Sequence, residues 1–115
     1  MILINLRSND IYPETLAKYA KDELESLGVS VKVYEEDEIR EMGLTAFLQV
    51  AKGSANKPRF IVMEYLKGKE NEKPLVFVGK GLTYDSGGYS IKSNDGMKTM
   101  NSDMGGSATV IGSMK

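Results

Sequence analysis

The sequence predicts an α/β fold in which a mixed β-sheet is flanked by helices. Helical and strand periodicities alternate along the first part of the chain, which is the order typical of α/β domains. A continuous apolar run at residues 75–78 then ends in a glycine-rich loop that leads to a final helical pattern. Open α/β sheets build their sites from these parts. The 115 residues are enough for one domain with its own core.

The first helix is predicted to begin at Pro13, because proline suits the first turn and the neighbouring Glu14 complements the helix dipole. The helix should run to Leu27 and stop at Gly28. Residues 2–4 fit either a short strand or the end of a helix. The stripe that supports the helix consists of Leu16, Ala20, Leu24 and Leu27.

A half-buried strand is predicted next, because apolar and polar residues alternate at residues 29–34. An acidic helical turn at residues 35–42 follows and closes at Gly43. Helical spacing of apolar residues resumes at residues 44–51 and stops at Gly53.

Two further strands are expected to form an antiparallel hairpin. The first covers residues 60–66 after Pro58, and the second covers residues 75–78 after Pro74. The polar stretch at residues 67–73 between them fits a short turn.

The last helix is expected to begin at Asp103 or just after it, with Met104, Ala108 and Ile111 on one face. No strand follows this helix, and the chain also begins abruptly with an apolar segment. An α/β sheet whose last helix has no partner strand is unfinished. Both ends therefore indicate a piece of a longer protein.

The composition excludes several classes of function. The chain is 41% hydrophobic and 27% charged with a net charge of −1, which argues against disorder, a membrane span and nucleic-acid binding. It has no cysteine and no histidine, which excludes disulfides, cysteine nucleophiles, Ser-His-Asp triads and histidine-ligated metals. Residues 1–41 hold ten acids and five bases, and residues 42–115 hold six acids and ten bases. Without a secretory signal, a cytoplasmic setting is expected.

Four ionisable residues mark the glycine-rich region. Asp103 could simply cap the last helix, and Asp85 could form an Asx-turn. Lys80 could lay its stem over a sheet edge, and Lys92 could be a surface lysine. Taken together, two carboxylates and an amine at the end of one strand could hold a divalent cation. A second lysine nearby could polarise a carbonyl group.

The motif V-G-K-G-L-T-Y-D-S-G-G-Y-S-I-K, followed by M-N-S-D-M-G-G-S-A-T-V-I-G, closely resembles the leucyl aminopeptidase (cytosol aminopeptidase) family of two-metal exopeptidases. The upstream segment A-F-L-Q-V-A-K-G-S-A-N-K-P-R-F-I-V-M-E-Y is similar to the same family. The resemblance covers nearly the whole chain. Two departures are Tyr12, where the family has threonine, and residues 5–9, which replace an asparagine- and proline-rich stretch.

The resemblance implies a role for each site residue. Lys80 is implied as the amine ligand of one metal, Asp85 as the bridge between two metals, and Asp103 as a ligand of the same metal as Lys80 that lies near the free amino group of the substrate. Lys92 is implied as the catalytic lysine that binds the substrate carbonyl, and Met100 as part of the pocket for the first side chain. The implied cofactors are two divalent ions, zinc or manganese, the substrate is a peptide N-terminus, and the family assembles as hexamers.

The same comparison implies an incomplete site. The family's other metal ligands lie in an N-T-D-A-E-G-R segment, which this sequence lacks, and the family's separate N-terminal domain is also absent. Residues 1–115 are therefore expected to be the N-terminal portion of the catalytic domain, with weak metal binding and no aminopeptidase activity of their own.

Two alternatives stay open from the sequence. The first is a non-catalytic module that keeps the fold and self-associates through an uncovered sheet edge and the apolar stripe of residues 104–111. The second is a small anion-binding domain that uses the loop at residues 81–88.

Overall fold

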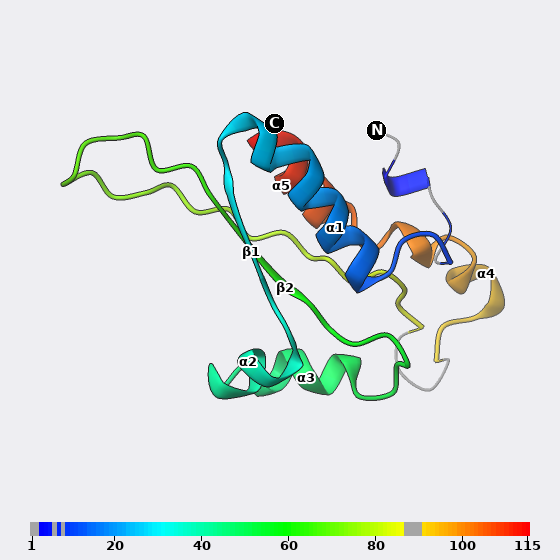
Figure 1. Ribbon diagram of the computed structural model, residues 1–115. Helices are drawn as coiled ribbons and strands as arrows, with labels where there is room; N and C mark the ends of the chain where they lie inside the picture. The colour runs from blue at the N-terminus through cyan, green and yellow to red at the C-terminus, as the bar shows by residue number, and fades with distance from the viewer. Residues whose placement is uncertain (1–2, 6, 8, 87–90) are drawn as a thin grey trace. The chain divides into compact units, whose positions relative to one another are not determined.

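The structure is a computed structural model of residues 1–115, and it describes all of them except residues 1–2, 6, 8 and 87–90. The chain divides into two compact units. One is Tyr12–Tyr65, and the other combines Met1–Ile11 with Leu66–Lys115. Figure 1 labels the helices and strands of both units. Among the described residues, no helix is both long enough and apolar enough to cross a membrane.

The unit Tyr12–Tyr65 begins with helix α1, Pro13–Leu24, which continues as the 3₁₀ helix η2, Glu25–Leu27. The backbone N–H of Tyr12 donates to Thr15 Oγ1 over 2.9 Å, which satisfies one donor at the helix start. Gly28 then adopts a left-handed φ of 80°. The predicted helix is confirmed, but Leu27 is 48% exposed and does not belong to the buried stripe, because the tighter 3₁₀ turn shifts its direction.

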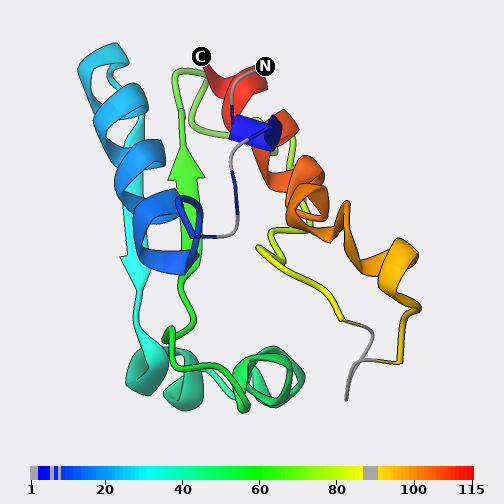
Figure 2. The same ribbon diagram turned by 90° about the vertical axis from the view of Figure 1, so that its right-hand side faces the viewer.

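The sheet of this unit has two antiparallel strands, β1 (Ser30–Tyr34) and β2 (Phe60–Glu64). Their register runs from Ser30 opposite Glu64 to Tyr34 opposite Phe60. Helix α1 lies along this sheet (Figure 2) and contacts β1. The buried side chains of the unit come from α1, from β1 and the residue before it, from α2 and from the residues before β2: Leu16, Ala17, Ala20, Leu24, Val29, Val31, Ile39 and Pro58.

Two short helices connect the strands, α2 (Glu36–Glu41) and α3 (Thr45–Ala51). The backbone N–H of Glu35 donates to Glu38 Oε2 over 2.9 Å at the start of α2, and Gly43 ends the turn with a φ of 73°. Phe47 of α3 meets Phe60 of β2 edge to face at 5.9 Å between ring centroids. Both predicted helices are confirmed.

The predicted hairpin is wrong. Strand β2 pairs with β1, and residues 75–78 form no strand. Their exposure ranges from 59% at Phe77 to 94% at Val78. A continuous apolar run is typical of a strand covered on both faces, and in the part of the chain that is described no strand pairs with it. The α/β class holds, but the described sheet is antiparallel and not mixed.

The second unit contains the 3₁₀ helix η1 (Leu3–Asn5) and the final helix α5 (Gly105–Met114). The apolar start is therefore a helical turn from Leu3, while residue 2 lies outside the described residues. Helix η1 contacts α5. The predicted face of the last helix is confirmed, because Met104, Ala108 and Ile111 are all buried.

Two short helices between them were not predicted, α4 (Asn94–Met97) and η3 (Met100–Ser102). Ser93 Oγ accepts the backbone N–H of Gly96 over 3.2 Å, so a serine N-cap was the available signal. Helix α5 starts without a side-chain cap, so the capping role considered for Asp103 is wrong.

Candidate metal centre

Four of the predicted site residues converge in the second unit. Lys80 Nζ lies 2.9 Å from Asp103 Oδ2 and 3.7 Å from Asp85 Oδ2. Lys92 Nζ lies 2.9 Å from the same Asp85 oxygen. Asp85 therefore stands between two lysines, and Lys80 stands between two carboxylates. Positive and negative groups thus alternate across a compact cluster. Its four residues lie within 23 positions of one another in the sequence.

Backbone hydrogen bonds hold these residues in place. The N–H of Ser107, in the first turn of α5, donates to the carbonyl oxygen of Lys80 over 2.8 Å. Asp103 directly follows η3, and its N–H donates to the Met100 carbonyl over 3.3 Å. The N–H of Lys92 donates to the Ser86 carbonyl over 3.1 Å. The first bond ties the segment of Lys80 to α5, and the other two fix the local backbone at Asp103 and Lys92.

Asp103 has an unusual environment for a carboxylate. Its Oδ2 atom is buried, and among the described residues it is the buried side-chain atom that accepts no hydrogen bond of ordinary geometry. Lys80 Nζ lies close to it, so the pair is held by charge more than by a well-directed hydrogen bond. The positive charge of Lys80 offsets the cost of burying this carboxylate oxygen.

The electrostatics of the cluster favour a charged lysine. The close contact with the Asp103 carboxylate raises the pKa of Lys80 above its ordinary value. Partial desolvation opposes this effect, and the charge of Asp85 adds to it. Lys80 is 59% exposed in its side chain, so solvent can reach the amine. An amine ligand must lose its proton before it can bind a metal.

The donor set fits a divalent cation in part. Among the described residues no three His, Cys, Asp or Glu side chains form a group. The cluster instead offers two carboxylates and an amine, and one carboxylate oxygen, Asp103 Oδ2, is buried against the amine of Lys80. Carboxylate oxygens suit manganese and magnesium, while a deprotonated amine suits zinc or cobalt. Three side chains can hold one cation but leave further positions open.

Lys92 belongs to the cluster, whereas Met100 and the loop considered for anion binding are placed differently. Lys92 Nζ lies 3.3 Å from the backbone carbonyl of Asp85, within hydrogen-bonding distance, and its side chain is 31% exposed. Met100 begins η3 and is half-buried, and its backbone carbonyl, which accepts the N–H of Asp103, links it to the cluster. The loop considered for anion binding, residues 81–88, includes residues 87 and 88, which lie outside the described residues.

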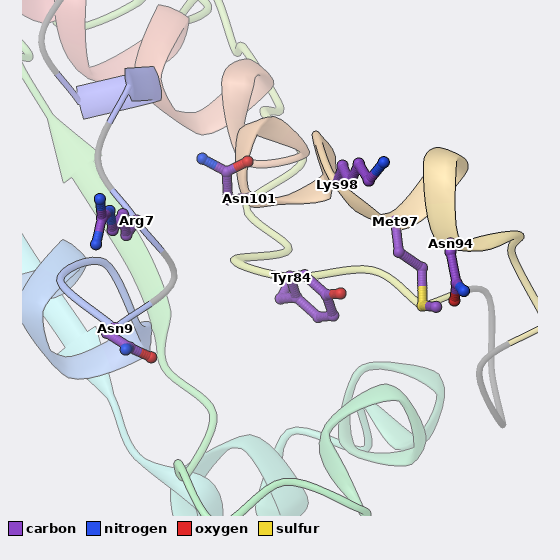
Figure 3. Close-up of a pocket in the computed structure, with 7 residues that line it drawn as sticks. All are labelled: Arg7, Asn9, Tyr84, Asn94, Met97, Lys98 and Asn101. Carbon is purple, nitrogen blue, oxygen red and sulfur yellow. The ribbon is translucent and has the colours of Figure 1, made fainter.

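A shallow cavity of about 430 Å³ lies in the same unit, and sequence reasoning missed it. Arg7 and Asn9 line it from the N-terminal segment, and Tyr84 lines it from the loop just before Asp85 (Figure 3). The lining contains cations, amides, a phenol and a thioether, but no carboxylate. The recurrence of asparagine near the motif was the available signal. The remaining lining residues are Asn94, Met97, Lys98 and Asn101.

The chain matches known proteins over nearly its whole length. Residues 2–115 match the family described as cytosol aminopeptidase family, catalytic domain. A relative from Clostridium perfringens named probable cytosol aminopeptidase is 53% identical over 113 residues, which are 97% of this chain and 23% of that protein.

Solved structures give the same result. A leucyl aminopeptidase from Trypanosoma cruzi is 36% identical with a TM-score of 0.85, over 95% of this chain and 21% of that one. The bottromycin maturation enzyme BotP, solved in complex with Mn, is 34% identical with a TM-score of 0.80, over 95% of this chain and 23% of that one. The chain thus spans about a quarter of the length of these relatives.

Proposed function

Because this chain belongs to the cytosol aminopeptidase family, we propose that it supplies part of the metal centre of an exopeptidase that removes N-terminal residues from peptides. Lys80 and Asp103 would hold one divalent cation, and Asp85 would bridge to a second. Zinc or manganese is the proposed identity. Bound cations supply Lewis-acid polarisation of the peptide carbonyl and activation of water.

Four of the chain's own residues have roles in this proposal. Asp103 accepts a hydrogen bond from the free amino group of the substrate, because its carboxylate faces the cluster beside Lys80. Lys92 donates from Nζ to the carbonyl oxygen on which negative charge develops. Met100 contributes apolar surface for the first side chain. Lys80 would hold a cation through its neutral amine, so its proton would have to pass to solvent, which reaches its 59% exposed side chain.

One observation carries the proposal: Lys80, Asp85, Lys92 and Asp103 come together with ion-pair distances of 2.9 to 3.7 Å. The Asp103 Oδ2 atom is buried and faces the Lys80 amine. A cation that took the place of the Lys80 proton would lie against this oxygen.

The proposal is tested by titrating the chain with Mn²⁺ in a calorimeter. Asp103→Asn should weaken binding by at least about tenfold, because a neutral amide is a poorer ligand than a carboxylate. Asp95→Asn is the matched control, since Asp95 also forms an ion pair, with Lys98 over 2.6 Å, but is exposed and outside the cluster. Equal affinities for the two variants would sink the proposal.

A matched lysine pair separates ligation from general charge. Lys80→Gln should lower Mn²⁺ affinity by at least about tenfold. Lys98→Gln removes the same charge from an ion pair with Asp95 and should leave the affinity within about twofold. Were loss of positive charge to increase binding equally in both variants, Lys80 would be a counter-ion and not a ligand.

The 115-residue chain by itself should release no leucine from a leucyl anilide, because three ligand side chains cannot complete a two-cation centre. The measurement is anilide hydrolysis with added Zn²⁺ or Mn²⁺, with an intact leucyl aminopeptidase as positive control. Metal-dependent turnover by the purified chain would overturn this expectation.

The setting and assembly follow the family. A cytosolic location is proposed because the curated relatives are named cytosol aminopeptidases. The proposed partner is the N-terminus of a peptide substrate, with no role for nucleic acid or membrane. We also propose that the protein forms a homo-oligomer, because the family that it resembles assembles as hexamers.

A second candidate function is a non-catalytic module that self-associates. The apolar stripe at residues 104–111, which the sequence offered as a self-association surface, is buried. Its residues Met104, Ala108 and Ile111 are 0 to 4% exposed. The exposed run at residues 75–78 favours the candidate instead, because an unpaired apolar segment can pair with a second copy.

Sizing in solution tests the second candidate. Val78→Lys should abolish any oligomer, whereas Val50→Lys, at an exposed position on α3, should not. Oligomers that persist in a chelator and vanish only with Val78→Lys favour the module. A monomer at all concentrations removes it.

A further inference from the structure

Two glycines bring the candidate centre's two halves into contact. A Cβ atom built on Gly79 would lie 2.5 Å from the carbonyl oxygen of Gly106 and 2.8 Å from the nitrogen of Ser107. A Cβ atom built on Gly106 would lie 2.7 Å from the nitrogen of Lys80. Real Cβ atoms do not approach other atoms this closely, and the obstacles are backbone atoms that cannot rotate away.

The close approach permits a specific hydrogen bond. The N–H of Ser107 donates to the Lys80 carbonyl over 2.8 Å, one residue after each glycine. This bond joins the segment that carries Lys80 to the first turn of α5. Asp103 lies just before that helix, so the bond also sets the distance between Lys80 and Asp103.

We propose that Gly79 and Gly106 are positioning residues, whose lack of side chains lets the backbones meet and places Lys80 Nζ 2.9 Å from Asp103 Oδ2. Only the purpose of this positioning rests on the proposed function. That purpose is to hold two ligands of one cation together. A methyl group at either position would push the Lys80 segment away from α5. Lys80 would then separate from Asp103.

Space, and not backbone conformation, explains these glycines. Among the described glycines, positive φ values occur at Gly28 and Gly43, so alanine can adopt the backbone of Gly79 or Gly106 without strain. An alanine substitution therefore tests the contact alone. Gly112 is the matched control, because it lies in the same helix and a Cβ atom there would meet nothing within 4 Å.

The first measurement follows exchange of the Ser107 amide hydrogen in the full chain by NMR without metal. Gly79→Ala and Gly106→Ala should each speed this exchange by about tenfold, the worth of one hydrogen bond. Gly112→Ala should leave it unchanged, with far-UV circular dichroism confirming the fold of each variant. Rapid exchange of Ser107 in the unmodified chain would overturn the proposal whether or not the variants fold.

The second measurement reports the pairing of Lys80 with Asp103. The Lys80 ¹³Cε chemical shift should change with Asp103→Asn in the unmodified chain and in Gly112→Ala, but should change several-fold less in the Gly79→Ala and Gly106→Ala backgrounds. A merely structural role would lower stability and leave this coupling intact, which would refute the positioning role.

Titration with Mn²⁺ separates the two claims. The proposal expects binding to the unmodified chain and at least about tenfold weaker binding to folded Gly79→Ala and Gly106→Ala. If the unmodified chain binds no Mn²⁺ while the NMR results hold, the proposed function fails and the positioning of Lys80 stands. If Mn²⁺ binds all variants equally, the positioning role fails and the proposed function stands.

Discussion

The two units use glycine in opposite ways. In Tyr12–Tyr65, Gly28 and Gly43 have φ values of 80° and 73° in open space, so they reverse the chain at helix ends. In the unit that holds the cluster, Gly79 and Gly106 provide room for backbone to meet backbone. The first use depends on neighbours in sequence. The second depends on a segment nearly 30 residues away.

This difference shows in which unit the local sequence pattern is enough to predict the structure. In Tyr12–Tyr65 the helix α1 buries one stripe and the strands β1 and β2 pair with each other, so periodicity and punctuation agree with the structure there. In the other unit the charged cluster forms from segments that have little regular structure around them. Long-range contacts between particular atoms define that region.

The largest effect is expected from the core of the first unit. Leu24→Ala should lower the free energy of unfolding by about 2–5 kcal/mol, because Leu24 is fully buried on α1. Leu27→Ala, the matched control from the same predicted stripe, should cost less than about 1 kcal/mol since Leu27 is half-exposed. Urea unfolding followed by circular dichroism measures both, and equal losses would show that Leu27 is buried after all.

A smaller effect sharpens the comparison of glycines. Gly43→Ala should cost about 1–2 kcal/mol, because alanine is strained at a φ of 73° even in open space. Gly53→Ala should be nearly neutral, since Gly53 has neither a left-handed φ nor an atom within 4 Å of a Cβ. The same urea measurement applies, and a neutral Gly43→Ala would contradict the conformational role.

The smallest effect is electrostatic. A hydrogen bond from Lys57 and the charges of Lys57 and Arg40 lower the pKa of Glu36. A folded pKa below the unfolded value gives stability that is present above the unfolded pKa and lost as pH falls through the folded pKa. Glu36→Gln should therefore be slightly less stable than the unmodified chain at pH 7, with the difference gone near pH 2.

The control for this experiment is Glu41→Gln, because Glu41 is exposed and forms no ion pair in the described part of the chain. Thermal unfolding at the two pH values measures both variants. A stability difference for Glu36→Gln that grows in acid would reverse the expected sign and reject the Lys57 contact.

The sequence predicted much of the fold for clear physical reasons. Helix α1 and strand β1 followed from spacing and punctuation that act over a few residues. Residues 75–78 did not, because an apolar run becomes a strand only when distant partners pair with it, and β2 pairs with β1. Sequence could not select that partner.

The candidate site was predictable to a different degree. The resemblance of the sequence motif to a known family pointed to Lys80, Asp85, Lys92 and Asp103. The spacing of these residues, taken alone, was also compatible with an ordinary structural role for each. The meeting of Gly79 with Gly106 could not be predicted, because glycines in a loop also fit simple turns. The cavity near Tyr84 depends on three separated segments, and no local pattern brings these together.

The central claim is that Lys80, Asp85 and Asp103 can hold a divalent cation together. The most direct measurement is an anomalous difference map at the zinc edge from crystals of the chain soaked in Zn²⁺. The account predicts a peak about 2.0–2.2 Å from Lys80 Nζ and from carboxylate oxygens of Asp85 and Asp103. Zinc bound only at other residues, with Lys80 still paired to Asp103, would contradict it.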